Sequence, residues 1–140
     1  MDKKKKKIHS MVSGILIVML FMGSISMAAP TRVTLFLDKN QVWSTRYSAT
    51  RSLKYSTVEA RCITVYPIDG SKDTFTRIQV VVENSAGTDI SNVETLYETS
   101  TIALPIKIKE TYMNTRNVYF RFRGNHPSYA ANAVVTYDGK

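Results

Sequence analysis

The chain has 140 residues, with 19 Lys and Arg against 11 Asp and Glu, so its formal net charge is +8. This length suits one domain and is too short for two of ordinary size. The composition excludes a collagen-like chain, a coiled coil and a largely disordered protein. Residues 29–140 carry 14 basic and 10 acidic side chains, because five lysines lie in one run near the N-terminus. The basic excess is therefore weak evidence for nucleic-acid binding, and we regard nucleic acid as an unlikely partner.

Residues 1–28 have the order of a secretory signal peptide. The basic run Lys3–Lys7 precedes an apolar stretch, Met11–Met22, and small residues follow. This apolar stretch falls well short of the roughly 20 residues needed to cross a bilayer. The best cleavage site lies between Ala28 and Ala29, because a later cut would leave a proline at the new N-terminus. We expect a secreted protein that is extracellular or held non-covalently at the cell wall, with residues 29–140 as one domain and no transmembrane segment.

Cysteine use agrees with export from a bacterium. Cys62 is the only cysteine, so no internal disulfide can form. Small secreted animal domains usually contain several disulfides. Cys62 lies in the strand-like stretch Val58–Val65, where a free cysteine most often serves as a small buried hydrophobic residue. A nucleophile and an intermolecular disulfide are the alternatives.

Apolar and polar residues alternate with period two in the first half of the mature chain. Strands are expected at Val33–Leu37, Val58–Tyr66 and Thr74–Glu83, with an irregular strand or a long ordered loop at Gln41–Ser56. The apolar positions of the second strand change face, which predicts a bulge near Cys62. The second and third strands are expected to form a hairpin with a long loop.

The second half shows the same alternation. Strands are expected at Ile102–Ile108, Val118–Arg123 and Ala133–Tyr137. Pro105 cannot donate a hydrogen bond to a neighbouring strand, so the first of these is expected at a sheet edge. Ser91 and Glu94 have the spacing of a helix capping box, which is compatible with a short helical turn. A loop or an edge strand is the alternative there.

Six or seven short alternating strands without a reliable helix predict an all-β fold. We expect a small antiparallel β-sandwich, with a small β-barrel as the alternative. Strands of a parallel sheet would form unbroken apolar runs, which this chain lacks.

No catalytic or metal-binding motif is present. His126 is the only histidine of residues 29–140, and it lies in a turn before a proline without a second ligand nearby. The chain lacks a nucleophile elbow and a glycine-rich phosphate loop, and its acids lie in turns or on polar strand positions. The acidic stretch Asp69–Asp73 is favoured as a turn over a calcium loop. We therefore expect a non-enzymatic protein without metal or cofactor.

Two groups of basic and aromatic residues are the candidate binding sites. The principal group consists of Lys107, Lys109, Tyr119, Arg121 and Arg123, and the secondary group of Arg46, Tyr47, Arg51, Lys54 and Tyr55. The first group would form one patch if its two strands were neighbours. Arginine binds phosphate or carboxylate through two donors, and aromatic rings stack on sugars. Because Arg121 and Arg123 are expected to face solvent, replacing both with glutamate should leave folding intact.

The favoured function is binding of an anionic wall polymer or an anionic lipid surface through a basic-aromatic sheet face. The alternatives are a secreted antimicrobial (bacteriocin-like) or toxin-like protein, and a surface assembly subunit that pairs through the edge strand at Ile102–Ile108. Basic residues that merely solubilise exposed strands are a further interpretation. The sequence leaves the oligomeric state open.

Overall fold

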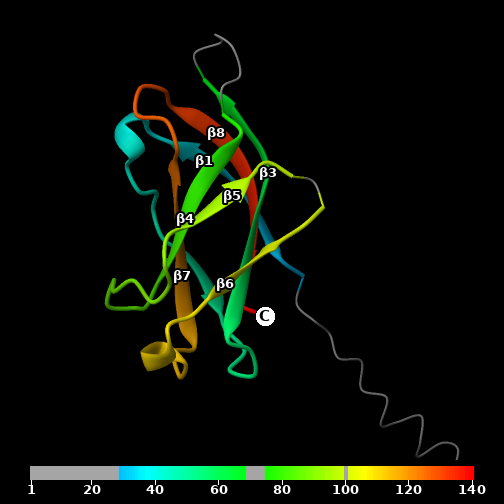
Figure 1. The fold of residues 1–140 in the computed structure, drawn as a ribbon, viewed down its shortest axis with the longest axis vertical. Coiled ribbons are helices and arrows are strands. Elements are labelled where there is room, and N and C mark those ends of the chain that lie inside the picture. Colours follow the sequence, from blue (N-terminus) through cyan, green and yellow to red (C-terminus); the bar gives the residue numbers. More distant parts are fainter. Residues whose placement is uncertain (1–28, 69–74, 100) are drawn as a thin grey trace, which may run out of the picture.

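Two four-stranded antiparallel sheets make up the computed structural model, which describes residues 29–68, 75–99 and 101–140 (Figure 1). The strands are β1 (Thr31–Leu37), β2 (Tyr47–Thr50), β3 (Thr57–Pro67), β4 (Arg77–Glu83), β5 (Glu94–Tyr97), β6 (Leu104–Lys107), β7 (Asn117–Gly124) and β8 (Ala131–Asp138), and two short 3₁₀ helices are η1 (Lys39–Gln41) and η2 (Glu110–Tyr112). Within the described residues there is no α-helix. The expected signal peptide, its cleavage site and the turn Asp69–Asp73 lie outside the described residues, apart from Ala29.

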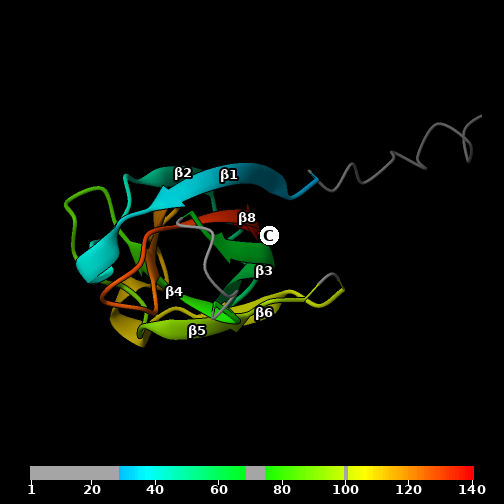
Figure 2. The same ribbon diagram turned by 90° about the horizontal axis from the view of Figure 1, so that it is seen from above.

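The strand order follows a simple rule. One sheet, here called the β1 sheet, has the order β1-β8-β3-β6, and the other, the β2 sheet, has the order β2-β7-β4-β5. The first strand pairs with the last, the second with the seventh, the third with the sixth and the fourth with the fifth. The chain therefore runs as one long two-stranded ribbon whose pairs alternate between sheets, which is the topology of an eight-stranded jelly roll. Viewed from above, β1 and β2 lie together at one side and β5 and β6 at the other (Figure 2).

The expected all-β antiparallel fold is confirmed, and the arrangement is consistent with a small β-sandwich. It has eight strands instead of six or seven. The additional strands are four residues long. One is β2, inside the stretch that alternation left irregular, and the other is β5, which begins at the expected cap residue Glu94. Such short strands contain too few alternating positions to be recognised from periodicity.

The core lies between the two sheets and is built from every second residue of the long strands. Phe120 and Phe122 of β7 are fully buried, as are Val135 and Ala133 of β8. The rings of Phe120 and Tyr137 lie 5.1 Å apart between centroids and join the two sheets across the core. Tilted aromatic pairs at this separation stabilise a fold beyond the area that they bury.

The expected bulge in β3 is confirmed. The register with β8 shifts between Cys62 and Thr64, which leaves Ile63 as the extra residue. Cys62 and Val65 are consequently both buried although their separation is odd. The backbone N–H of Val65 donates to a carboxylate oxygen of Glu98 at 3.0 Å, just beyond this irregularity.

Two expectations about strand partners have opposite outcomes. The strand that contains Pro105 is β6, and it lies at the edge of the β1 sheet as expected. The expected hairpin of β3 with β4 is wrong, because these strands belong to different sheets. β3 instead pairs with β6 and β8, which follow it by some 40 and 70 residues. Alternation identifies a strand but carries no information on which distant strand satisfies its hydrogen bonds.

The C-terminal end packs against the residues that follow β2. The N–H of Ser52 donates to the carbonyl of Lys140 at 2.6 Å, and a Cβ at Gly139 would overlap the backbone of Thr50. Because a backbone obstacle cannot rotate away, we expect Gly139→Ala to lower the free energy of unfolding by about 1–3 kcal/mol. Gly124→Ala is the matched control, since its Cβ would meet Phe75 at an ordinary 3.5 Å. Urea unfolding of both variants measures this difference, and equal midpoints would contradict it.

Candidate functional site: the arginine face

The outer surface of the β2 sheet carries the residues that fit the predicted binding chemistry best. In β7, Tyr119, Arg121 and Arg123 alternate with buried residues and point away from the core. In the register of β7 with β4, Arg123 lies opposite Gln79 and Tyr119 lies opposite Glu83. We call this surface the arginine face; it comprises Trp43, Arg46, Arg77, Gln79, Glu83, Tyr119, Arg121 and Arg123.

A buried carboxylate lies among these arginines. Glu83 is only 4% exposed, and its two oxygens lie 3.1 Å from Nε of Arg46 and 2.9 Å from Nη1 of Arg121. A carboxylate removed from water to this extent must be paired with cations to remain ionised. The first task of Arg46 and Arg121 is therefore to neutralise Glu83 within the fold.

Further contacts confine Arg46. Its guanidinium lies 4.1 Å from the centroid of the Tyr119 ring, a cation–π distance. Its terminal nitrogens donate to the carbonyl oxygens of Asn84 and of Ser85. Since Nε binds Glu83, all three nitrogens of this side chain have partners inside the protein. Arg121 is held in a similar way, because its Nε donates to the carbonyl of Ser44 at 3.1 Å.

Arg123 is positioned differently. Its Nε donates to Oε1 of Gln79 at 2.6 Å, and its guanidinium lies 4.4 Å from the centroid of the Trp43 ring. Its two terminal nitrogens have no hydrogen-bond partner among the described residues. The side chain is thus fixed at Nε and supported by a ring, while the part of the guanidinium that binds oxyanions remains available. Arg77, at one end of β4, is exposed.

The principal predicted group is divided between the two sheets. The condition for a single patch is not met, because β6 with Lys107 belongs to the β1 sheet and β7 to the β2 sheet. Lys109 follows β6 and donates from Nζ to the carbonyl of Asp89 at 3.0 Å. The segment containing η2 crosses between the sheets here, so consecutive strands of the sequence are not neighbours. Both lysines are exposed, and their binding role stays a prediction.

The secondary predicted group is also dispersed. Only Arg46 joins the arginine face. Tyr47 packs on the core, with its ring centroid 6.1 Å from those of Phe122 and Tyr137. Lys54 and Tyr55 lie exposed in the connection between β2 and β3.

Arg51 of the secondary group is 2% exposed and cannot serve as a surface contact, so that prediction is wrong. Its terminal nitrogens donate to the carbonyl oxygens of Met113 at 2.7 Å, Thr115 at 3.2 Å and Tyr55 at 2.5 Å. Burial lowers the pKa of this guanidinium. Arg51 therefore joins two loops that are distant in sequence.

Sequence reasoning missed Trp43, Arg77, Gln79 and Glu83 as parts of this face. The polar phase of β4 was a usable signal for the last three, because Arg77 and Gln79 alternate with buried Ile78 and Val80. That signal could not identify β7 as the neighbouring strand. Trp43 precedes β2 in a segment without regular structure, where periodicity gives no orientation.

The other reactive side chains are engaged in the fold. Cys62 is fully buried, as predicted, and burial together with the charge of Glu98 raises the pKa of its thiol to about 12. A thiol with such a pKa is a poor nucleophile at neutral pH. His126 is half-buried rather than exposed, and its Nδ1 accepts a hydrogen bond from the N–H of Ser128 at 3.1 Å.

Two features are absent from the described residues. No group of three or more His, Cys, Asp or Glu side chains there has the arrangement to hold a metal ion. In the same residues, no helix has the length and apolar character required to traverse a bilayer.

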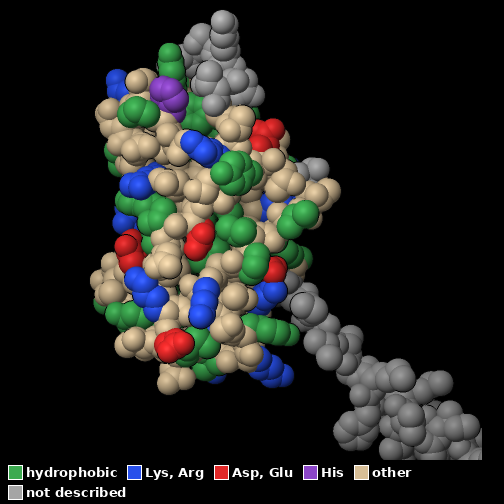
Figure 3. Space-filling view, in the orientation of Figure 1, with side chains coloured by type: hydrophobic (Ala, Val, Ile, Leu, Met, Phe, Trp, Pro, Cys, Tyr) green, Lys and Arg blue, Asp and Glu red, His purple; other side chains and the backbone are tan. Residues whose placement is uncertain are grey.

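On the side of the molecule in Figure 3, Lys and Arg side chains alternate with acidic, polar and hydrophobic ones. The basic residues of this side therefore act as separate groups within a mixed surface.

No family model matches the chain, and neither the curated proteins nor the solved structures gave a match.

Proposed function

We propose that this chain is an exported, non-enzymatic protein of bacterial origin that binds an anionic cell-surface or wall polymer through the arginine face. The order of residues 1–28 supports export. The two sheets and their buried interior support a rigid β-sandwich scaffold for the binding surface.

The observation that carries the binding proposal is the geometry of Arg123. Its guanidinium is oriented by Gln79 and supported by Trp43, while its terminal nitrogens have no partner among the described residues. A guanidinium held in one orientation loses little conformational entropy when it binds an oxyanion in two-pronged geometry. Arg77 adds a second positive charge on the same face.

The structure also changes the roles that the sequence suggested. The rings of Trp43 and Tyr119 each have an arginine over them, so these rings are poorly placed to stack on sugars. Recognition therefore depends on the charged groups of the polymer. Arg46 and Arg121 are assigned to the stability of this face, because Glu83 engages both. Lys107 and Lys109, if they bind polymer, form a separate site on the β1 sheet side.

Binding of the purified protein to immobilised inorganic polyphosphate and to isolated bacterial wall tests this proposal. Affinity should fall as salt rises, because ionic contacts release counterions. Arg123→Gln should weaken binding and reduce the slope of log affinity against log salt by about one. Lys107→Gln removes the same charge from the other sheet and is the matched control.

Retention that does not change with salt would overturn the ionic mechanism. A loss of affinity in Lys107→Gln but not in Arg123→Gln would move the site to the β1 sheet. No retention of the wild-type protein on either material would overturn polymer binding altogether.

A further inference from the structure

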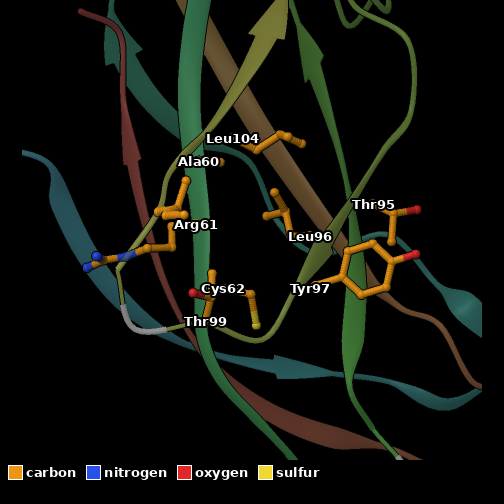
Figure 4. Close-up of a pocket in the computed structure, with 9 residues that line it drawn as sticks. Ala60, Arg61, Cys62, Thr95, Leu96, Tyr97, Thr99 and Leu104 are labelled. Atoms are coloured by element: carbon orange, nitrogen blue, oxygen red, sulfur yellow. The ribbon is translucent and has the colours of Figure 1, made fainter.

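An apolar pocket lies where the two sheets separate at the β5 and β6 side. Its volume is about 260 Å³ (Figure 4). It is lined by Ala60, Arg61, Cys62, Thr95, Leu96, Tyr97, Thr99, Ile102 and Leu104. β5 provides one wall, and β3 with the segment leading into β6 provides the other. A cavity of about 150 Å³ accommodates benzene, so this pocket has room for an alkyl chain of roughly eight to ten carbons.

The pocket is apolar at its base and open at its rim. Cys62 and Ala60 are buried, and Figure 4 shows Leu96 and Leu104 near them. At the rim, Tyr97 is 59% exposed and Ile102 is 72% exposed. These two exposed side chains extend the apolar surface of the pocket toward solvent, where a ligand could contact them.

A positive charge lies next to this rim. Tyr97 of β5 is the direct cross-strand partner of Arg77 in β4, and both are exposed. Directly opposed residues of an antiparallel pair have Cβ atoms about 5 Å apart. Arg77 therefore lies beside Tyr97, a residue that lines the pocket, on the same face of the β2 sheet.

The electrostatics inside the pocket set the orientation of an occupant. The negative charge of Glu98 contributes to the raised pKa of the Cys62 thiol, so this charge acts at the base of the pocket. An anionic group would be repelled from the base and attracted to Arg77 at the rim. The guanidinium of Arg61, which also lines the pocket, points away from Leu96 and Leu104 (Figure 4), so among the described residues we assign the charged group of a ligand to Arg77, beside Tyr97.

We propose that this pocket binds the alkyl chain of a single-chain anionic amphiphile, taken up as a monomer, with its anionic group at Arg77. The ligand class follows from the apolar interior, the exposed rim and the cation beside it. The proposal goes beyond polymer binding, because it requires the pocket and Arg77 but not the geometry of Arg123.

Calorimetric titration with decanoate below its aggregation concentration tests the proposal. Decanol serves as the uncharged analogue and butyrate as the short one. Wild-type protein should bind decanoate more tightly than decanol and should not bind butyrate. Arg77→Gln should weaken decanoate about three- to fivefold and leave decanol unchanged. Arg116→Gln, at an exposed arginine just before β7, is the charge-matched control and should change neither.

Substitutions that fill the pocket provide a second test. Leu104→Trp should abolish binding of both ten-carbon ligands, whereas Val93→Trp, at an exposed apolar residue outside the pocket, should not. If Leu104→Trp fails to unfold cooperatively, Ile102→Asp at the exposed rim replaces it and should repel decanoate. Equal decanoate binding by the pocket and control variants would overturn the site. Equal effects of Arg77→Gln on decanoate and decanol would overturn the anionic class.

Measurements of polyphosphate and vesicle binding separate this proposal from the proposed function. Leu104→Trp should retain polyphosphate binding, because it leaves the arginine face intact. Failure of polyphosphate to bind, with decanoate still bound, would remove the polymer proposal alone. Binding to phosphatidylglycerol vesicles without any binding of decanoate would overturn uptake of a monomer.

Discussion

Replacing Arg51 with methionine is expected to lower the free energy of unfolding by about 3–5 kcal/mol. Methionine retains much of the side-chain volume but donates no hydrogen bond. The carbonyl oxygens of Met113 and Tyr55 would then lose a charged donor. Hydrogen bonds to a charged group contribute more than neutral ones, and a buried oxygen without a partner carries an additional desolvation cost.

The control for this variant is Arg51→Lys. Lysine retains the charge, but its single nitrogen cannot replace two separate guanidinium nitrogens, so we expect an intermediate loss of stability. Urea unfolding gives both values, and an unchanged slope would show that the native state, not the compactness of the unfolded chain, is affected. A loss below about 1 kcal/mol in Arg51→Met would show that water can replace the guanidinium.

The positions of the long strands could be predicted because the alternation of buried and exposed side chains is a property of each strand alone. The alternation around Val118, Phe120 and Phe122 required only that one face be buried, and all three residues are fully buried. The bulge near Cys62 was predicted from a change of phase within one strand. The edge position of Pro105 followed from a missing donor on one residue. None of these inferences required knowledge of a distant part of the chain.

The composition of the binding surface could not be predicted in the same way. In this topology the neighbours of a strand come from the opposite arm of the ribbon, so β6 and β7 are adjacent in sequence but lie in different sheets. Lys107 and Arg121 therefore lie in different sheets, while Arg46 and Glu83 were not recognised as a pair. Jelly-roll pairing of this kind depends on long-range contacts that a period-two pattern does not encode.

Arg51 and Arg121 show a second limit of sequence reasoning. Arg51 lies in a polar segment and Arg121 at an outward position of an alternating strand, and an arginine in either place is usually solvated. Arg51 is instead buried beneath two loops, and Arg121 is held by a buried carboxylate. The partners that decide between these states are 62 and 38 residues away. The local sequence cannot distinguish a solvated arginine from a structural one.

The contact between Arg121 and Glu83 leads to a second prediction. We expect Arg121→Glu to destabilise the protein by about 3–5 kcal/mol. The orientation inferred from alternation is correct, since Arg121 points outward. However, its Nη1 lies 2.9 Å from the carboxylate of Glu83, whose side chain is only 5% exposed. The substitution removes one of two cations from a buried carboxylate and places a like charge beside it. The expectation that this residue tolerates glutamate is therefore revised.

Arg123→Glu is the matched control on the same face of the same strand. Its partner is the neutral Gln79, so the substitution removes a hydrogen bond and a cation–π contact but leaves no buried charge unpaired. We expect a loss of about 1 kcal/mol or less. Thermal and urea unfolding of the two variants at neutral pH give the comparison. Equal stabilities at neutral pH would show that Arg46 alone suffices to neutralise Glu83, which would make Arg121 available as a second ligand contact beside Arg123.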